Sequence, residues 1–288
     1  MLDRRVETFL KLCETMSYRA AAEQLHITQP AVTQHIHALE QHYGCELFRY
    51  DGRSLSRTRD AELLERTFRA MLYQEKRLRA ELARPQAAHF NIGVTKTIAE
   101  AVVAPQAARF LDAGNTLTLD VNNTEYLMQR LNRGELDFAL IEGFFDAGRY
   151  DSLPYSRERF VGLCSAGHRF ARRRVPVDEA AAEPLILREQ GSGTREIMEG
   201  MLHSLNRSAG DFRRSISVSG CALLCALVER GCGVSFGYDV IARRYPGIGW
   251  FLLDGIDIAH DFCYVFLKGG GAQSAVEMFD SFRGGTGE

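Results

Sequence analysis

The stretch MSYRAAAEQLHITQPAVTQHIHALEQHYGCELF, residues 16–48, decides the fold of the first part of the chain. Its apolar spacing predicts two short helices, Tyr18–Leu25 and a second that begins after Thr28, with the polar break HIT between them. Ser17 and Thr28 stand where a hydroxyl can accept hydrogen bonds from the first turn of a helix. Gly44 suits the left-handed residue that ends a helix. Two short helices joined so tightly are typical of a helix-turn-helix.

The second helix of this pair has one apolar side and one polar side. The apolar side comprises Ala31, Val32, Ile36 and Leu39, and Pro30 lies in the first turn, where its missing N–H costs little. The polar side comprises Gln29, Thr33, Gln34 and His37. Gln and Thr side chains suit base edges and phosphates in a DNA major groove, so this side predicts a recognition surface. From this pattern alone, an ordinary pair of helices with a solvated face is equally consistent.

A helix over residues 2–15 precedes the pair, and a basic hairpin follows it. Leu47-Phe48 predicts a short strand, Asp51-Gly52 a turn, and residues 54–58 the return strand. Four arginines lie between Arg49 and Arg59, with only Asp51 opposing them. Because Arg53 stands at the tip, where it could enter a narrow minor groove, the hairpin is interpreted as the wing of a winged helix-turn-helix.

From residue 61 the pattern becomes that of one long helix. Residues at alternating three- and four-residue steps are apolar with one exception: Ala61, Leu64, Phe68, Met71, Glu75, Leu78 and Leu82. Such heptad spacing predicts a seam against a second helix. The expected dimerisation residues are therefore Leu64, Phe68, Met71 and Leu78. Arg84-Pro85 breaks the helix, and residues 85–89 are expected to form a hinge.

Beyond residue 89, strand and helix patterns alternate. The predicted strands are NIGVT, TLTLDV, LDFALI, RFVGLCS, PLILRE, SISVS, GCGVSFG and CYVFL, and helices are expected over 98–111, 125–133, 194–205 and 221–230. This alternation predicts a mainly parallel α/β sheet system. In such folds ligands bind at the carboxyl ends of strands and the N-termini of helices.

Two segments of this region combine a strand end with a helix start. Thr95 and Thr97 follow the first strand, and GSGTR at residues 191–195 offers close backbone approach, the hydroxyls of Ser192 and Thr194, and the cation Arg195. Free N–H groups and the helix dipole favour an anion at such places, so we expect a small anionic metabolite. Helix capping with no ligand is the alternative, above all for Thr194.

Residues 9–61 resemble the N-terminal domain of LysR-type transcriptional regulators. The resemblance is carried by Phe9, Ser17, Ala21-Ala22, Leu25, ITQPAVTQHI, Leu39-Glu40, Gly44, Leu47-Phe48, Arg53 and Thr58. It extends to NIGVTKTIAEAVVAP, GELDFALI, REQGSGTR and LVERGCGVSF, so it covers nearly the whole chain. One departure is RTRDA after the wing, where the family usually has Leu-Thr-x-Ala-Gly, and it leaves the packing of the wing against the long helix in doubt.

The resemblance implies three parts: a winged helix-turn-helix over 1–60, a dimerising linker helix and hinge over 61–88, and a periplasmic-binding-protein-like effector domain over 89–288. The last would have two Rossmann-like α/β subdomains, about 89–161 with 263–288, and about 162–262. The expected DNA-binding residues are Ser17, Thr28, Gln29, Pro30, Thr33, Gln34, His37 and Arg53. The expected effector-binding residues are Thr95, Lys96, Thr97, Asn123, Glu142, Ser192, Thr194 and Arg195. The implied partners are an operator in double-stranded DNA, a small-molecule effector, a homodimer or homotetramer, and RNA polymerase.

The composition of the chain and the motifs that it lacks limit which other functions need to be considered. The chain has 288 residues, a net charge of -2 and seven cysteines without a CxxC pair. With no signal peptide and no run long enough to cross a bilayer, a cytoplasmic protein with reduced thiols and no membrane partner is expected. No P-loop, nucleophile elbow or metal spacing is present, so we expect no enzyme activity, catalytic residue, cofactor or metal. The rivals are a solute-binding protein and an α/β enzyme without a DNA role.

Several reactive residue types have an ordinary structural explanation. Cys221 and Cys225 stand four apart on a predicted helix, but free cysteine is usually a small buried hydrophobe. The histidines on or after the second helix of the pair, at 35, 37 and 42, are expected to face solvent or DNA. Asp137 lacks an accompanying nucleophile or base motif, so a structural or hinge role is expected.

Overall fold

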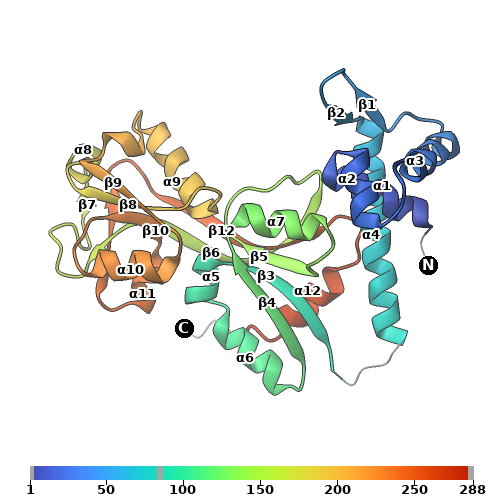
Figure 1. Ribbon diagram of the computed structural model, residues 1–288. Coiled ribbons are helices and arrows are strands. Elements are labelled where there is room, and N and C mark those ends of the chain that lie inside the picture. Colours follow the sequence, from blue (N-terminus) through green and yellow to red (C-terminus); the bar gives the residue numbers. More distant parts are fainter. Residues whose placement is uncertain (1–2, 83–86, 285–288) are drawn as a thin grey trace. The chain divides into compact units, whose positions relative to one another are not determined.

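Figure 1 shows the computed structural model of the protein, which describes residues 3–82 and 87–284. Contacts divide the chain into two compact units, one built mainly from residues before 87 and the other mainly from those after it. The N-terminal unit comprises α1 (Arg4–Thr15), α2 (Tyr18–Leu25), α3 (Gln29–Tyr43), β1 (Phe48–Tyr50), β2 (Leu55–Arg57) and α4 (Arg59–Leu82). The expected helix break at Arg84-Pro85 lies outside the described residues.

The C-terminal unit alternates strands and helices, as the sequence predicts. Its first half comprises β3 (His89–Thr95), α5 (Lys96–Ala101), α6 (Ala104–Asp112), β4 (Thr116–Asn122), α7 (Thr124–Asn132), β5 (Phe138–Ile141) and β6 (Tyr150–Ser165). There follow β7 (Arg174–Val175), α8 (Val177–Ala181), β8 (Pro184–Arg188), α9 (Gly193–Ser204), β9 (Arg214–Val218) and α10 (Cys221–Glu229). The last elements are β10 (Ser235–Tyr238), α11 (Asp239–Arg244), β11 (Ile248–Leu253), β12 (Ile258–Leu267) and α12 (Gln273–Asp280).

The helix starts and stops expected between residues 16 and 48 are confirmed. Ser17 accepts a hydrogen bond from the backbone N–H of Ala20 at 3.3 Å, and Thr28 accepts one from that of Ala31 at 3.3 Å. Gly44 ends α3 with a φ of 66°, a left-handed conformation that glycine adopts without steric cost. Local hydrogen bonding therefore sets the lengths of α2 and α3.

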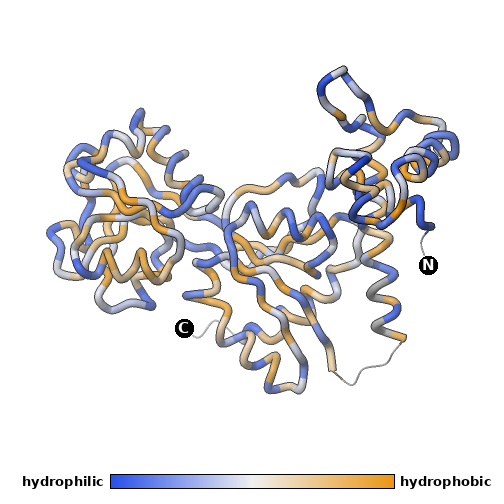
Figure 2. Tube along the Cα trace, viewed as in Figure 1, coloured by the Kyte–Doolittle hydropathy of each residue, from blue (hydrophilic) through white to orange (hydrophobic). Residues whose placement is uncertain are grey.

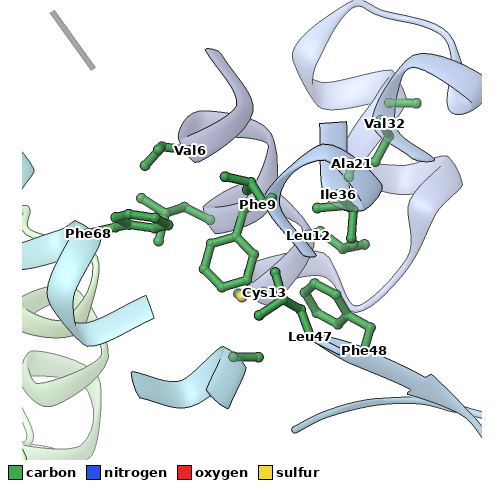
Figure 3. Packing of buried hydrophobic residues seen from close by; sticks show 14 residues of the cluster. Val6, Phe9, Leu12, Cys13, Ala21, Val32, Ile36, Leu47, Phe48 and Phe68 are labelled. Carbon is green, nitrogen blue, oxygen red and sulfur yellow. The ribbon is translucent and has the colours of Figure 1, made fainter. Parts of the chain in front are cut away.

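The core of the N-terminal unit is a cluster of side chains from α1, α2, α3, β1 and α4 (Figure 3). Phe9 lies between two other rings, with its centroid 5.8 Å from that of Phe48 and 5.7 Å from that of Phe68. Val32 and Ile36 of α3 are buried in the same cluster, as the apolar side of that helix predicts. Because burying each large apolar side chain contributes about 1.5–3 kcal/mol, this cluster fixes the orientation of α3 and turns its polar side outward.

The C-terminal unit is built on one mixed sheet of eight strands. Their order is β4-β3-β5-β12-β6-β11-β7, and β10 also pairs with β6. β3 runs parallel to β4 and β5, whereas β12 is antiparallel to β5, and β10 and β11 are antiparallel to β6. The small second sheet of β8 and β9 is parallel. The expectation of a mainly parallel system is thus corrected, because β12 is antiparallel to β5, and β6 is antiparallel to both β10 and β11.

The strand β6 is twice as long as the sequence pattern suggests. Residues 160–164 of the run RFVGLCS are buried, whereas residues 150–159 alternate between more and less exposed and carry charges at 157–159. Those charges conceal a strand whose side chains alternate between the two faces of the sheet. The expected subdomain boundaries at 161/162 and 262/263 therefore fall inside β6 and β12, so two continuous strands join the subdomains.

Candidate functional site

The exposed side of α3 is polar and hollowed. Gln29, Pro30, Thr33 and Gln34 line an open depression of about 560 Å³. Figure 2 shows α3 and the tip of the wing largely in hydrophilic colours, in contrast to the strands of the large sheet. The structure thus brings four of the residues expected to contact DNA onto one accessible face.

Three other residues expected to contact DNA also stabilise the helices. Ser17 and Thr28 use their hydroxyl oxygens as the caps described above. The His37 Nδ1 lies 3.0 Å from the Glu40 carboxylate, while 70% of the His37 side chain stays exposed. The other oxygen of Glu40 accepts a hydrogen bond from the backbone N–H of Leu47 at 2.9 Å. Glu40 therefore ties the last turns of α3 to the segment that enters the wing.

The tip of the wing is organised by a carboxylate. Asp51 accepts hydrogen bonds from the backbone N–H groups of Ser54 at 2.8 Å and Arg53 at 2.9 Å. These bonds, that from Ser54 foremost, hold the pKa of Asp51 below its usual value, so the carboxylate stays ionised at neutral pH. The Arg53 side chain is exposed and forms no ion pair within the described part of the chain. Its guanidinium is free to contact a phosphate or a groove.

Arg57, which stands where the resemblance of residues 9–61 leads us to expect Leu, connects the wing to α4. Its guanidinium lies 2.6 Å from the Glu65 carboxylate, which also binds Arg69 at 2.9 Å. Only 7% of Arg69 is exposed, and its guanidinium lies 3.5 Å from Glu14 of α1. A chain of ion pairs therefore joins the wing, α4 and α1, and this is how the departure from the family pattern is packed.

The apolar residues of the heptad seam of α4 divide along the length of the helix, with the first ones packed in the core and the later ones exposed. Ala61 and Phe68 are buried in the core of the N-terminal unit, and Leu64 packs against it. The expectation that Phe68 faces a second chain is corrected, because its ring is covered within one chain, whereas the role expected of the partly buried Leu64 stays a prediction. Met71 and Leu78 remain 46% and 54% exposed. The other exposed apolar residues of α4 are Leu63, Leu72 and Leu82.

Threonines from two subdomains converge on one glutamate in the C-terminal unit. Glu142 is 2% exposed, and its carboxylate accepts hydrogen bonds from the hydroxyls of Thr95 and Thr194, the latter at 3.0 Å. The hydroxyls of Thr97 and Thr194 lie 3.3 Å apart. The Glu142 carboxylate thus lies between the start of α5 and the start of α9, which is where the sequence led us to expect an anionic ligand.

An ionic cluster lies beside these hydroxyls. The Lys96 ammonium is 2.7 Å from the Glu189 carboxylate and 3.3 Å from the Ser219 hydroxyl. Arg188 binds the same carboxylate at 2.9 Å and donates a hydrogen bond to Thr97 at 3.2 Å. Burial opposes ionisation of Glu189, but the bonds from Arg188 and Lys96 outweigh it and lower its pKa to about 2. Lys96, expected to bind the effector, is therefore engaged within the protein.

An open pocket of about 390 Å³ lies next to these clusters, between α7 and α9. It is lined by Thr124, Glu125, Met128, Phe144, Gln190, Gly191, Ser192, Arg195, Glu196 and Glu199. Of the residues expected to bind the effector, Ser192 and Arg195 line it, and the Asn123 amide lies 3.5 Å from the Gln190 carbonyl oxygen. The other lining residues were not expected, although all but Phe144 lie within a few positions of Asn123, Ser192 or Arg195, because only folding shows which of them face one another. The one available signal was the pairing of Arg195 with Glu199 four residues later.

Two glycines let the loop before α9 approach the facing subdomain closely. A Cβ on Gly193 would lie 2.4 Å from the Glu142 carbonyl oxygen, and one on Gly191 would lie 2.6 Å from the Glu125 carboxylate. The backbone N–H of Glu125 also donates to the Gly191 carbonyl at 3.3 Å. Glycine is therefore required for this approach, as the GSGTR motif suggested.

The other reactive residues have structural roles. The Sγ atoms of Cys221 and Cys225 are 3.9 Å apart in an apolar cluster, and all seven cysteines are free. Asp137 accepts a hydrogen bond from the backbone N–H of Asn91 at 2.7 Å, which ties β3 to the segment before β5. Within residues 3–82 and 87–284, no three His, Cys, Asp or Glu side chains are grouped so that they could hold a metal ion. None of the described helices combines the length and apolar character needed to span a membrane.

Family models match both parts of the chain. Residues 4–62 match the model "Bacterial regulatory helix-turn-helix protein, lysR family", and residues 83–282 match "LysR substrate binding domain". The chain belongs to the LysR family of transcriptional regulators. This LysR-type regulator therefore combines a DNA-binding helix-turn-helix domain with an effector-binding domain, as its residues and the resemblance predicted.

Individual relatives agree with this assignment. The regulator is 27% identical over 205 residues to the HTH-type transcriptional regulator CysL of Bacillus subtilis, a match that covers 69% of each chain. Full-length LysG from Corynebacterium glutamicum, solved with its effector arginine bound, aligns with a TM-score of 0.62 at 19% identity over 96% of this chain and 99% of LysG. A full-length OxyR variant from Pseudomonas aeruginosa aligns with a TM-score of 0.61 at 20% identity over 98% and 94%. These structures confirm the expected fold class.

Proposed function

We propose that this regulator reads an operator through α3 and the wing, and that a small molecule bound in the C-terminal unit alters transcription. The observation that carries the proposal is the depression lined by Gln29, Pro30, Thr33 and Gln34, on the side of α3 opposite the core. Amide and hydroxyl groups on an exposed helix face suit direct readout of base edges. The winged helix-turn-helix places such a helix in the major groove.

In this proposal some side chains contact the bases and others contact the sugar-phosphate backbone. Gln29, Thr33 and Gln34 contact base edges, and Pro30 keeps the first turn open for them. Ser17, Thr28 and His37 contact the sugar-phosphate backbone beside the recognition face while capping or buttressing the helices. Because α3 carries no Lys or Arg, the exposed Arg53 supplies much of the attraction to phosphate or to a narrow minor groove.

The test is fluorescence anisotropy with duplex DNA from upstream of the regulator's own gene. Gln34→Ala should weaken operator binding by roughly 5- to 150-fold, the value of one good amide contact with a base, and leave binding to unrelated DNA unchanged. Arg53→Ala should weaken binding to all sequences alike. The slope of log binding constant against log salt concentration should become shallower by about one.

The matched control is Gln24→Ala, which removes an exposed glutamine of α2 from outside the recognition face. It should bind the operator like the unmodified protein. If the Gln34→Ala variant binds the operator as tightly as the Gln24→Ala variant does, Gln34 does not contact a base and the proposal fails.

We propose further that α4 pairs two subunits through its exposed apolar side, giving a homodimer or homotetramer. Met71 and Leu78 carry this pairing, and Leu82, which lies on the same face of α4, extends it. Met71→Asp with Leu78→Asp should lower the mass measured by light scattering to that of one chain, whereas Leu223→Asp, an exposed leucine of α10, should not. An unchanged mass in the α4 variant contradicts this pairing.

The cellular location and the partners follow from operator binding. A regulator that reads chromosomal DNA works in the bacterial cytoplasm and needs no membrane partner. It acts by binding and not by catalysis, and it influences RNA polymerase at the promoter.

The effector is expected between the two subdomains, where Thr95, Thr97, Glu142 and Thr194 already connect both sides. A ligand that alters these contacts changes how the two subdomains are arranged. In this proposal that change alters how the helix-turn-helix domain binds DNA. The arginine bound to LysG supports a small metabolite as the ligand class.

A further inference from the structure

We propose that the pocket between α7 and α9 binds an organic cation, an amine or guanidinium compound, and not the small anion that the helix starts suggested. This inference rests on the proposed function, because it names the ligand class of the effector domain. Two independent features point to a ligand: an excess of unpaired carboxylates around the pocket, and a buried hydroxyl that lines it without a partner.

The place of an anionic ligand is already taken. The buried Glu142 carboxylate accepts hydrogen bonds from Thr95 and Thr194 at the starts of α5 and α9. A ligand carboxylate or phosphate would have to displace Glu142 from these hydroxyls, because both already donate to its buried side chain. The hydroxyls at the two helix starts are therefore not available to an anion.

The open pocket carries an excess of negative charge. Glu125, Glu196 and Glu199 line it against a single cation, Arg195. Arg195 is neutralised, because its Nε lies 2.8 Å from Glu199 and its Nη1 donates to the Arg188 carbonyl at 3.1 Å. Glu125 and Glu196 form no ion pair with any residue in the described ranges. A concave site lined by one sign of charge concentrates ligands of the opposite sign.

Ser192 supplies the second observation. It is 4% exposed, lines the pocket, and its hydroxyl neither caps α9 nor bonds to any other residue that the structure describes. Because this hydroxyl lines the pocket and has no partner among the described residues, it is available to a polar ligand atom. The Glu125 carboxylate lies over the neighbouring Gly191. Ser192 and Glu125 line the same pocket, so both an acceptor oxygen and a carboxylate are available to an ammonium or guanidinium bound there.

The remaining walls suit an organic cation better than a metal ion. Phe144 is 62% exposed and Met128 lies beside it in the lining, so an aromatic face and a thioether adjoin the carboxylates. Aromatic faces attract organic cations. The described carboxylates do not gather in a group of three that could coordinate a metal. The volume of about 390 Å³ matches a small metabolite.

The test uses fragments of the ligand class on the full-length protein. The methionine methyl groups are labelled with carbon-13, and the Met128 signal is assigned with Met128→Leu. Methylguanidinium and ethylammonium are titrated and compared with acetate at equal ionic strength. We expect the Met128 signal to shift in a saturable way with both cations and not with acetate. A non-saturable drift or no shift with the cations, or a larger shift with acetate, overturns the inference.

Charge-removing variants test the residues. The double variant E125Q/E196Q should bind both cations about 2- to 30-fold more weakly, as expected for the loss of two exposed charge contacts. Both side chains are exposed, so folding should persist, which the other methionine signals verify. The control E7Q, an exposed carboxylate of α1, should bind like the unmodified protein. Equal binding by E125Q/E196Q and E7Q overturns the inference.

The inference and the proposed function can fail separately. Operator binding by the unmodified protein is measured by anisotropy in the absence of fragments. Loss of operator specificity with an intact Met128 response would refute only the DNA-reading role. A normal operator response without a saturable Met128 shift would refute only the cation pocket.

Discussion

Replacing Phe68 with Ala should destabilise the N-terminal unit within each chain, and not merely weaken the pairing of two chains. Phe68 is 3% exposed, and its ring centroid lies 5.7 Å from that of Phe9 and 6.0 Å from that of Tyr43. It therefore joins α4 to α1 and α3. Loss of this ring leaves a cavity at the centre of the unit that positions the recognition face.

The expected magnitude follows from the buried area. A phenylalanine that buries about 200 Å² contributes at most about 5 kcal/mol at roughly 25 cal/mol per Å². Phe→Ala changes in protein cores cost about 3–5 kcal/mol. Since about 1.4 kcal/mol corresponds to a factor of ten, the slowest amide protons of α1 and α3 should exchange roughly 100- to 4000-fold faster.

Hydrogen exchange followed by mass spectrometry measures this locally, without requiring that the whole chain unfold in one step. Met71→Ala is the matched control, because Met71 lies on the same helix but is 46% exposed. It should change the stability of the unit by no more than about 0.5 kcal/mol while weakening self-association. If Phe68→Ala leaves α1 and α3 as protected as Met71→Ala does, Phe68 is an interface residue and the assignment of α4 to the core is wrong.

Three further predictions concern the charged groups. Glu142→Gln leaves one oxygen in place of the two that accept hydrogen bonds from Thr95 and Thr194, and losing a buried acceptor costs about 1–3 kcal/mol, so amides at the starts of α5 and α9 should exchange about 5- to 150-fold faster; unchanged rates would contradict the bridging role. Arg57→Ala should lower the stability of the N-terminal unit by at most about 1 kcal/mol, because Glu65 keeps Arg69. Arg69→Ala should cost more, about 1.5–3 kcal/mol, because the nearly buried Arg69 side chain binds both Glu65 and Glu14, although Glu65 keeps Arg57; equal urea midpoints for the two variants would refute this. The pKa of Glu189, lowered to about 2, means that its stabilising effect is complete above about pH 4.3 and is lost as the pH falls toward 2; exchange around Lys96 that already accelerates between pH 7 and 5 would be inconsistent with this.

Much of the N-terminal unit could be predicted because its determinants are local. The caps at Ser17 and Thr28, the stop at Gly44 and the period of the apolar residues in α3 each depend on neighbours within a few positions. The recognition face followed directly, since a helix with one buried stripe must expose the opposite side. The same pattern could not say which partner covers an apolar residue. A heptad spacing is identical whether the neighbour is the chain's own α1 or a second α4, and only packing separated Phe68 from Met71.

The sequence by itself determined the family, the winged helix-turn-helix and the glycine-rich loop before α9, because these are written in contiguous residues. Only the tertiary structure decided what lies in the cleft. Glu142 reaches Thr95 and Thr194 across 47 and 52 residues of chain, and the acidic pocket combines α7, α9 and two loops. The charge at a site depends on all the groups that folding brings together. The two helix starts alone therefore suggested an anionic ligand, whereas in the folded protein the Glu142 side chain occupies that position.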